Sequence, residues 1–217
     1  MRTAIALAIA LGSVSAAAAQ SDEPSADERA AMAAFDAYKT SLMSRDGAAA
    51  MRVLLPSAAA FYEEARQAAL SMPEPRLRRR GAIFRFTVLD LRHRHTKAEV
   101  RATTGAGILR QAISDGRVGS AVPSMDAQGA QVRGNRAFVR VGHSGSEATV
   151  SMLFRRHEGR WKLDLTHLMN LTTGAMEAQM SRLGEGDVNE GMLRAIETLV
   201  RRPVSRETIW APLDSRD

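Results

Sequence analysis

The chain of 217 residues contains no cysteine. This absence excludes disulfide bonds, thiolate nucleophiles, cysteine-ligated metal sites and a lipid-modified amino-terminal cysteine. Aromatic residues make up only 5% of the sequence, which is few for a protein that binds single-stranded nucleic acid by stacking bases on aromatic rings. No apolar run reaches the roughly 20 residues that a membrane-spanning helix needs.

Recognisable catalytic and cofactor motifs are missing as well. The sequence has no GxSxG elbow, no P-loop and no HExxH, and Gly105-x-Gly107 is too short to be a dinucleotide fingerprint. His93 and His95 would converge on a metal only within a strand, and no carboxylate cluster accompanies them. We therefore assign no catalytic, cofactor-binding or metal-ligating residue from motifs, and we expect no cofactor.

The first 20 residues have the layout of a secretory signal peptide. Arg2 supplies a positive charge, residues 4–11 are apolar, and Ala17 and Ala19 form an A-x-A site before Gln20. We expect segment 1–20 to be removed on export and residues 21–25 to form a flexible leader. This predicts an exported protein, periplasmic or secreted, and the abundance of alanine and arginine suggests a bacterial chain.

The formal net charge is +6 at pH 7, which fits nucleic acid, anionic lipid or anionic polymer as a partner. Export and the scarcity of aromatic residues argue against nucleic acid. The basic residues concentrate in segment 76–95, where Arg78, Arg79 and Arg80 are candidates for an anion-binding patch that contacts an anionic surface. We favour the alternative, a solvated helix face whose long side-chain stems cover apolar surface.

Helical periodicity dominates the first half of the chain. Phe35, Tyr38 and Leu42 recur at spacings of three and four, which predicts a helix from Ala26 to the break at Asp46. We predict further helices over 48–55 and 57–72, a helix rather than a strand over 76–95, and a helix over 97–115. Ser57 and Thr96 are the expected N-caps of the second and fourth of these, Thr96 as part of a capping box with Glu99.

After Gly119 the apolar period changes from helical to two. Three segments alternate apolar with polar residues. A turn at Gly134 precedes the first segment, and a turn at Gly159 lies between the second and the third. This predicts an antiparallel meander with one apolar and one wet face. The apolar positions are Ala137, Val139, Val141, Val150, Met152, Phe154, Trp161, Leu163 and Leu165.

Helical spacing returns after the meander. Met192, Ile196 and Leu199 fall on one face of a helix that we expect to begin near Asp187. Residues 209–213 (IWAPL) are apolar and follow this helix. They are predicted to dock back onto the domain as a strap.

Helices followed by a meander that ends in FRRHEGRWKLDL, residues 154–165, resemble the nuclear transport factor 2-like superfamily. The resemblance covers about residues 26–168 and is closest to exported bacterial members outside the enzyme branches. It implies an α+β fold in which N-terminal helices pack on the concave face of a curved antiparallel sheet. We therefore expect a cone-shaped domain over 26–180 and a C-terminal helical extension and strap over 181–217.

That superfamily contains isomerases, dehydratases, hydrolases, ligand carriers and scaffolds, so the fold does not decide the function. Its enzymes place Asp, His or Tyr inside the cone. Strand parity points His143 inward, and His167 as well if the last strand continues past Leu165, while Tyr38 lies on the apolar stripe of the first helix. These three are the pocket candidates, whereas Asp164 is expected on the surface beside a basic residue.

Two functions remain open at this point. One is non-catalytic binding of a small apolar ligand or of an envelope partner, through the mouth of the cone or the basic helix. The other is a small acid/base hydrolase or isomerase that uses His143, His167 or Tyr38. We favour binding because the sequence places no converging carboxylate beside these residues; a scaffold with a filled cone is a weaker third option. Charged residues on the outer sheet face argue mildly against a dry dimer interface there.

Overall fold

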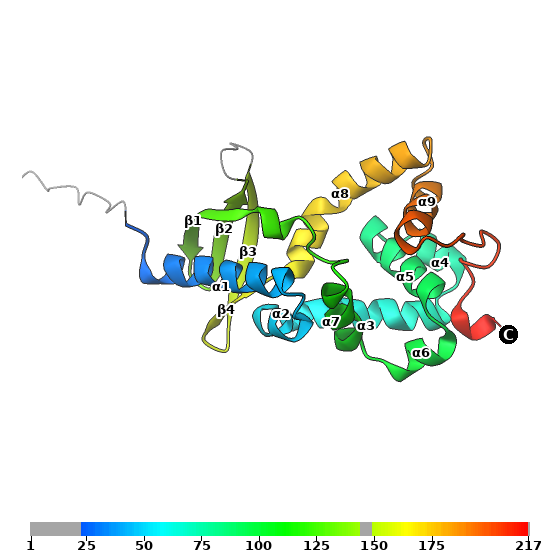
Figure 1. Ribbon diagram of the computed structural model, residues 1–217, viewed down its shortest axis with the longest axis horizontal. Coiled ribbons are helices and arrows are strands. Elements are labelled where there is room, and N and C mark those ends of the chain that lie inside the picture. The colour runs from blue at the N-terminus through cyan, green and yellow to red at the C-terminus, as the bar shows by residue number, and fades with distance from the viewer. Residues whose placement is uncertain (1–22, 144–148, 217) are drawn as a thin grey trace, which may run out of the picture.

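The computed structural model describes residues 23–143 and 149–216 (Figure 1). Within these ranges the chain is α+β, as the sequence predicted, with nine α-helices and a four-stranded antiparallel sheet. The signal-peptide prediction for residues 1–20 lies outside the described residues. No helix in the described part of the chain is long and apolar enough to cross a membrane.

The sheet is a meander with its strands in chain order, β1 (Asp126–Arg133), β2 (Arg136–Gly142), β3 (Thr149–His157) and β4 (Arg160–Leu163). The register confirms the predicted alternation, because Val139 pairs with Met152 and Phe154 pairs with Leu163. All four side chains are buried. The predicted continuation of the last strand to Leu165 is wrong, since β4 ends at Leu163 and a helix begins at Leu165.

Helix α1 (Ala26–Met43) lies across the apolar face of the sheet (Figure 1). It begins where the sequence predicted, because Ser25 and Glu28 form a capping box. Its stripe of Phe35, Tyr38 and Leu42 is buried in one hydrophobic core with the inward residues of the sheet. The helices therefore cover the apolar side of the meander, as the fold-class prediction required.

Ion pairs tie both halves of α1 to the sheet. Arg156 on β3 pairs with Asp27 in the first turn of the helix. Lys39, three turns later, lies 2.7 Å from the carboxylate of Asp126 at the start of β1. These contacts support the position that the buried stripe of α1 sets on the apolar face of the sheet.

The helices between α1 and the sheet are α2 (Gly47–Val53), α3 (Pro56–Ser71), α4 (Glu74–Arg78), α5 (Ala82–Arg94), α6 (Lys97–Ala102) and α7 (Gly105–Ser114). Two predicted helices are each split in two. The basic segment 76–95 is helical but breaks at residues 79–81, and the helix after Thr96 breaks where Thr104 caps α7 through the amide of Gly107. Ser57 is not an N-cap, because α3 already begins at Pro56.

Two long helices follow the sheet, α8 (Leu165–Leu183) and α9 (Val188–Val200). Helix α9 begins as predicted, with the carboxylate of Asp187 accepting hydrogen bonds from the backbone amides of Asn189 and Glu190. Figure 1 shows the sheet and α1 at one end of the molecule, α4, α5, α6 and α9 at the other, and α3 and α8 running between them. The predicted strap is confirmed by the burial of Ile209, Trp210 and Leu213.

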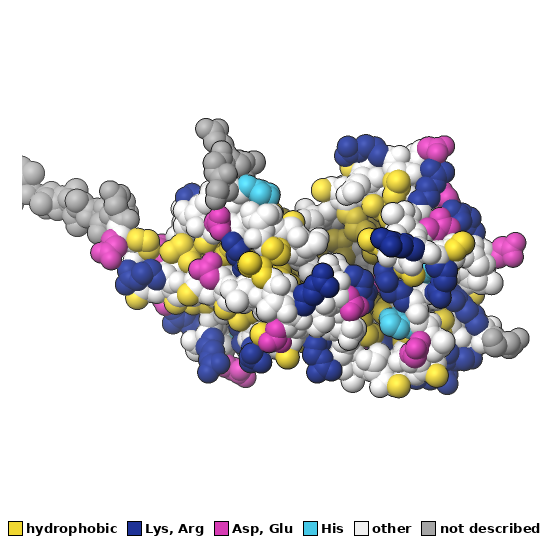
Figure 2. Space-filling model, in the orientation of Figure 1, with side chains coloured by type: hydrophobic (Ala, Val, Ile, Leu, Met, Phe, Trp, Pro, Cys, Tyr) yellow, Lys and Arg dark blue, Asp and Glu magenta, His cyan; other side chains and the backbone are white. Residues whose placement is uncertain are grey.

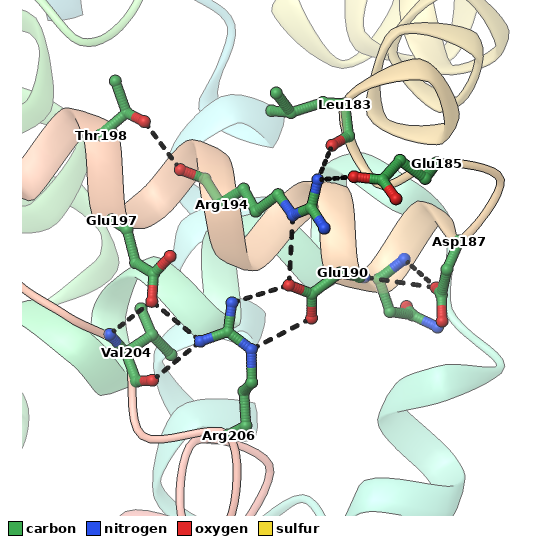
Figure 3. Close-up of polar contacts among 10 residues, drawn as sticks. Leu183, Glu185, Asp187, Glu190, Arg194, Glu197, Thr198, Val204 and Arg206 are labelled. Atoms are coloured by element: carbon green, nitrogen blue, oxygen red, sulfur yellow. Dashed lines mark hydrogen bonds and ion pairs between the residues drawn. The ribbon is translucent and has the colours of Figure 1, made fainter.

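Arginine side chains hold the corner between α8 and α9 (Figure 3). Arg194 donates from Nη1 to the carbonyl of Leu183, 2.9 Å away, and to the carboxylate of Glu185, 2.7 Å away. Glu190 in turn accepts from Arg194 and, at 2.7 Å, from Arg206 of the tail. The far end of α8 is thereby tied to both α9 and the C-terminal segment.

Gly119 lies where the segment between α7 and β1 passes closely over α1. Its φ of +74° is in the left-handed region, and a Cβ there would come within 2.6 Å of Leu42 Cδ1 and 3.2 Å of the hydroxyl of Tyr38. Gly116 has a similar φ of +71° but open space around its Cα. Comparing substitutions at Gly116 and Gly119 therefore separates the cost of a left-handed backbone from the cost of packing a Cβ against α1.

We expect Gly116→Ala to lower the free energy of unfolding by about 1 kcal/mol, the cost of a left-handed alanine. Gly119→Ala should cost about 3 kcal/mol because overpacking against α1 adds to the same backbone penalty. Urea denaturation followed by circular dichroism measures both. Equal losses in the two variants would contradict the close approach of this segment to α1.

Candidate functional site

A cavity of about 1010 Å³ opens between the sheet and the helical half of the molecule. Its walls come from the part of the apolar sheet face that α1 leaves uncovered, from α5 and α8, and from residues 115–122 of the segment that follows α7. Figure 2 shows hydrophobic side chains gathered in this hollow. The volume lies at the upper end of the roughly 300–1,000 Å³ that ligand pockets usually have.

The sheet contributes Val141, Val150 and Met152 to the cavity wall. Val150 is 43% exposed although it shares the inward parity of the other two. Leu199 on α9, predicted to share a helical face with Met192 and Ile196, is 60% exposed and lines the cavity too. Val150 and Leu199 thus border the open cavity and are not packed in the core.

Helix α8 supplies the opposite wall with Leu165, Leu168, Met169, Thr172 and Met176. Their spacing of three, one, three and four residues places them on one helical face. The other side of the middle of α8 faces solvent, and Leu171 there is 57% exposed. Thus α8 presents one face to the cavity and the opposite face to solvent.

Asp164 determines where α8 starts. Its Oδ1 accepts hydrogen bonds from the backbone amide of His167 at 3.0 Å and from the hydroxyl of Thr166 at 2.7 Å, and its Oδ2 accepts from Nε of Arg155 at 2.8 Å. The side chain is buried, so the predicted surface position is wrong, whereas the pairing with a basic residue is confirmed. Burial alone would raise the pKa of Asp164, but these hydrogen bonds outweigh it and lower the pKa.

Charged side chains gather at one place in the mainly apolar cavity wall. Asp90 on α5 accepts from Nε of Arg94 at 2.5 Å and from Nη1 of Arg117 at 3.1 Å. Arg117 also pairs with Asp115 at 3.0 Å. All four residues line the cavity, and we call them the polar end.

Tyr62 of α3 lines the cavity and is 6% exposed. Burial raises the pKa of its phenol to about 12, with nearby Arg117 opposing and Asp90 reinforcing the shift. Tyr62 is therefore a neutral hydroxyl at physiological pH, able to donate or accept a hydrogen bond but unable to act as a base.

Arg92 holds the opposite face of α5. Its guanidinium, 2% exposed, donates to the carbonyls of Ala68, Ala69 and Met72 at the end of α3 and to that of Trp210 in the strap. No carboxylate among the described residues pairs with it. Because Arg92 points away from Asp90 and Arg94 on the helical wheel, this anchor turns the latter two toward the cavity.

The three pocket candidates from the sequence do not line the cavity. His143 follows β2, is exposed, and lies 3.1 Å from the hydroxyl of Ser124. His167 sits half-buried in the first turn of α8, because the strand that would have turned it inward ends at Leu163. Tyr38 is buried against Gly119, and its hydroxyl has no hydrogen-bond partner among the described residues.

The candidate anion patch is largely occupied by internal contacts. Arg78 pairs with Glu74 at 2.6 Å and lies 3.9 Å from the ring centroid of Trp210. Arg80 pairs with Glu64 at 2.7 Å and stacks on a phenylalanine ring. Arg79 is exposed. This arrangement favours the solvated face that covers apolar surface over a dedicated anion site.

The polar end and the neighbouring Tyr62 were partly visible in the sequence. Asp90 and Arg94 stand four apart, the spacing of a helical ion pair, but they merge with the surrounding basic residues. Tyr62 shares a spacing of four, three and four with Ala58, Ala65 and Ala69, which are among the buried positions of α3. Nothing local in the sequence indicates that Arg117 reaches Asp90.

Comparisons with known proteins provide no relative for this site. No family model, no curated protein and no solved structure matches the chain. Among the residues that the structure describes, no group of three or more His, Asp or Glu side chains is arranged to hold a metal ion. The cavity is therefore interpreted from its own chemistry.

The two tyrosines of the chain give a direct test of this interior. Burial raises the pKa of Tyr62 to about 12 and raises that of Tyr38 further. Since both folded-state values lie above the unfolded value of about 10, the stability that they contribute is present below pH 10 and is lost as pH rises through the folded values. We expect no tyrosinate absorbance at 295 nm below about pH 11 in the folded protein.

Urea-unfolded protein is the control for this titration and should ionise both tyrosines near pH 10. Tyr62→Phe identifies the residue that ionises first in the folded state. A tyrosine that titrates near pH 10 before any loss of far-ultraviolet circular dichroism would contradict the buried positions.

Proposed function

We propose that the protein is an exported, non-catalytic binding protein whose cavity takes up an elongated and mainly apolar molecule. The cavity carries the proposal: about 1010 Å³ lined by aliphatic and methionine side chains, with its charged side chains gathered in the polar end. A mainly apolar cavity with its charged groups at one place suits a ligand that has an apolar body and one polar end.

The composition of the walls supports this proposal. Four methionines, Met125, Met152, Met169 and Met176, border the cavity. Their unbranched, polarisable side chains adapt to ligands of different shape better than β-branched residues do. A wall of this kind suits flexible hydrocarbon chains more than one rigid substrate.

The acid/base alternative finds less support. Its candidates His143, His167 and Tyr38 are not among the residues that border the cavity. The carboxylates that do border it, Asp90 and Asp115, are both engaged by arginines. A general base needs a free acceptor within hydrogen-bond reach of the substrate, and the polar end offers donors instead.

The relationship to the nuclear transport factor 2-like superfamily remains part of the proposal. It is supported by α1 lying on the apolar face of a meander and by a cavity that continues the same face. Export rests on the layout of residues 1–20 in the sequence. A carrier of apolar molecules outside the cytoplasm is the function that combines these features.

The test uses diphenylhexatriene, a neutral apolar rod whose fluorescence rises in a dry environment. We expect saturable binding to the wild-type protein and displacement by hexadecanol below its solubility limit. Leu168→Gln places an amide on the cavity wall and should weaken binding about tenfold, since burying an unpaired amide costs about 1–3 kcal/mol.

The matched control is Leu171→Gln, the same substitution three residues further along α8 on an exposed side chain that does not border the cavity. It should bind the probe as the wild type does, and circular dichroism should show both variants folded. Equal weakening in both, or no saturable binding to the wild type, would refute the proposed function.

A further inference from the structure

The polar end has hydrogen-bond donors to spare and no spare carboxylate acceptor. Both oxygens of Asp90 accept from arginines, and Asp115 accepts from Gln111 at 2.7 Å and from Arg117. Within the described residues, Arg94 uses only its Nε, so that Nη1 and Nη2 have no acceptor. A ligand group that meets this end must therefore accept hydrogen bonds.

The charges of the polar end differ in how deeply they lie. The side chains of Asp90, Arg94 and Arg117 are 11%, 20% and 21% exposed, whereas that of Asp115 is 40% exposed. The three deeper groups carry one negative and two positive charges, which leaves one positive charge. Asp115 balances this charge from the solvent side, where a carboxylate can swing into water at little cost.

We propose that the cavity selects long-chain amphiphiles with one negative charge at the head, such as long-chain carboxylates, and that Arg94 is the residue that binds this headgroup. The inference rests on the proposed function, because the apolar chain must occupy the cavity for its head to reach the polar end. A guanidinium binds a carboxylate or phosphate oxygen pair through two parallel N–H bonds, and Arg94 has both of its terminal nitrogens available.

The headgroup also completes the local charge balance. An anion beside Arg94 and Arg117 takes the place that Asp115 holds in the free protein, so the buried sum becomes zero. A neutral hydroxyl head leaves the donors on Nη1 and Nη2 of Arg94 without a charged acceptor. A cationic head adds to the positive excess. Desolvated charges of one sign are costly. The polar end therefore discriminates among amphiphiles that have the same hydrocarbon chain but different headgroups.

The experiment measures displacement of diphenylhexatriene by three amphiphiles with the same chain length, all kept below micelle formation: hexadecanoate, hexadecanol and hexadecyltrimethylammonium. We expect hexadecanoate to displace the probe at a concentration at least tenfold lower than hexadecanol, with the cation weakest. Hexadecyl phosphate displacing as well as hexadecanoate would identify the shared anionic charge, and not the carboxylate alone, as the feature selected.

Arg94→Gln should weaken hexadecanoate at least tenfold and leave hexadecanol within twofold of the wild type. Arg76→Gln removes the same charge from an exposed residue that does not border the cavity, and it should change neither. Hexadecanol thus reports structural damage, and the Arg76 variant reports the loss of net charge.

The two proposals fail in different ways. Equal displacement by all three amphiphiles in the wild type, or equal weakening of hexadecanoate and hexadecanol by Arg94→Gln, would overturn the headgroup inference and leave apolar binding intact. A wild-type protein that binds neither the probe nor any of the amphiphiles would overturn the proposed function, and this inference with it.

Discussion

The buried guanidinium of Arg92 sets the orientation of α5, on which the cavity depends. It is a buried cation satisfied by backbone carbonyls at the end of α3 and in the strap. Burial, assisted by nearby Arg216, lowers its pKa to about 10, so it stays charged at physiological pH. Residues 90 and 94 share a helix face while residue 92 points the other way. This anchor, together with the buried apolar side chains of α5 such as Phe84 and Val88, therefore holds Asp90 and Arg94 toward the cavity.

Local patterns predicted the elements whose signals lie within a few residues. The capping box at Thr96 and the strand alternation around Val139 and Met152 are confirmed because they depend on neighbouring side chains and one period. The end of β4 was not predictable in this way. Asp164 looks like an outward strand residue in RWKLDL, yet it caps α8, since bonds to Thr166, His167 and Arg155 override the alternation.

The cavity could not be predicted from the sequence because its parts are distant along the chain. Asp90 meets Arg117 across 27 positions, and the sheet wall meets α8 only because the meander ends in a helix cap. The prediction of apolar side chains on the inner sheet face was correct, but pattern alone does not show whether such residues are covered or open. Val150 and Met152 have the same parity and differ in exposure for this reason.

Helix α8 is anchored mainly near its two ends. Of its 19 residues, only Leu165 and Met180 are buried, and they lie near opposite ends. Asp164 fixes the first support, and Arg194 fixes the second at the corner with α9. The span between them contacts the core only through partly buried side chains, among them Leu168, Met169 and Met176. If the cavity takes up a ligand as we propose, bending of this one helix would adapt its volume without unfolding either support.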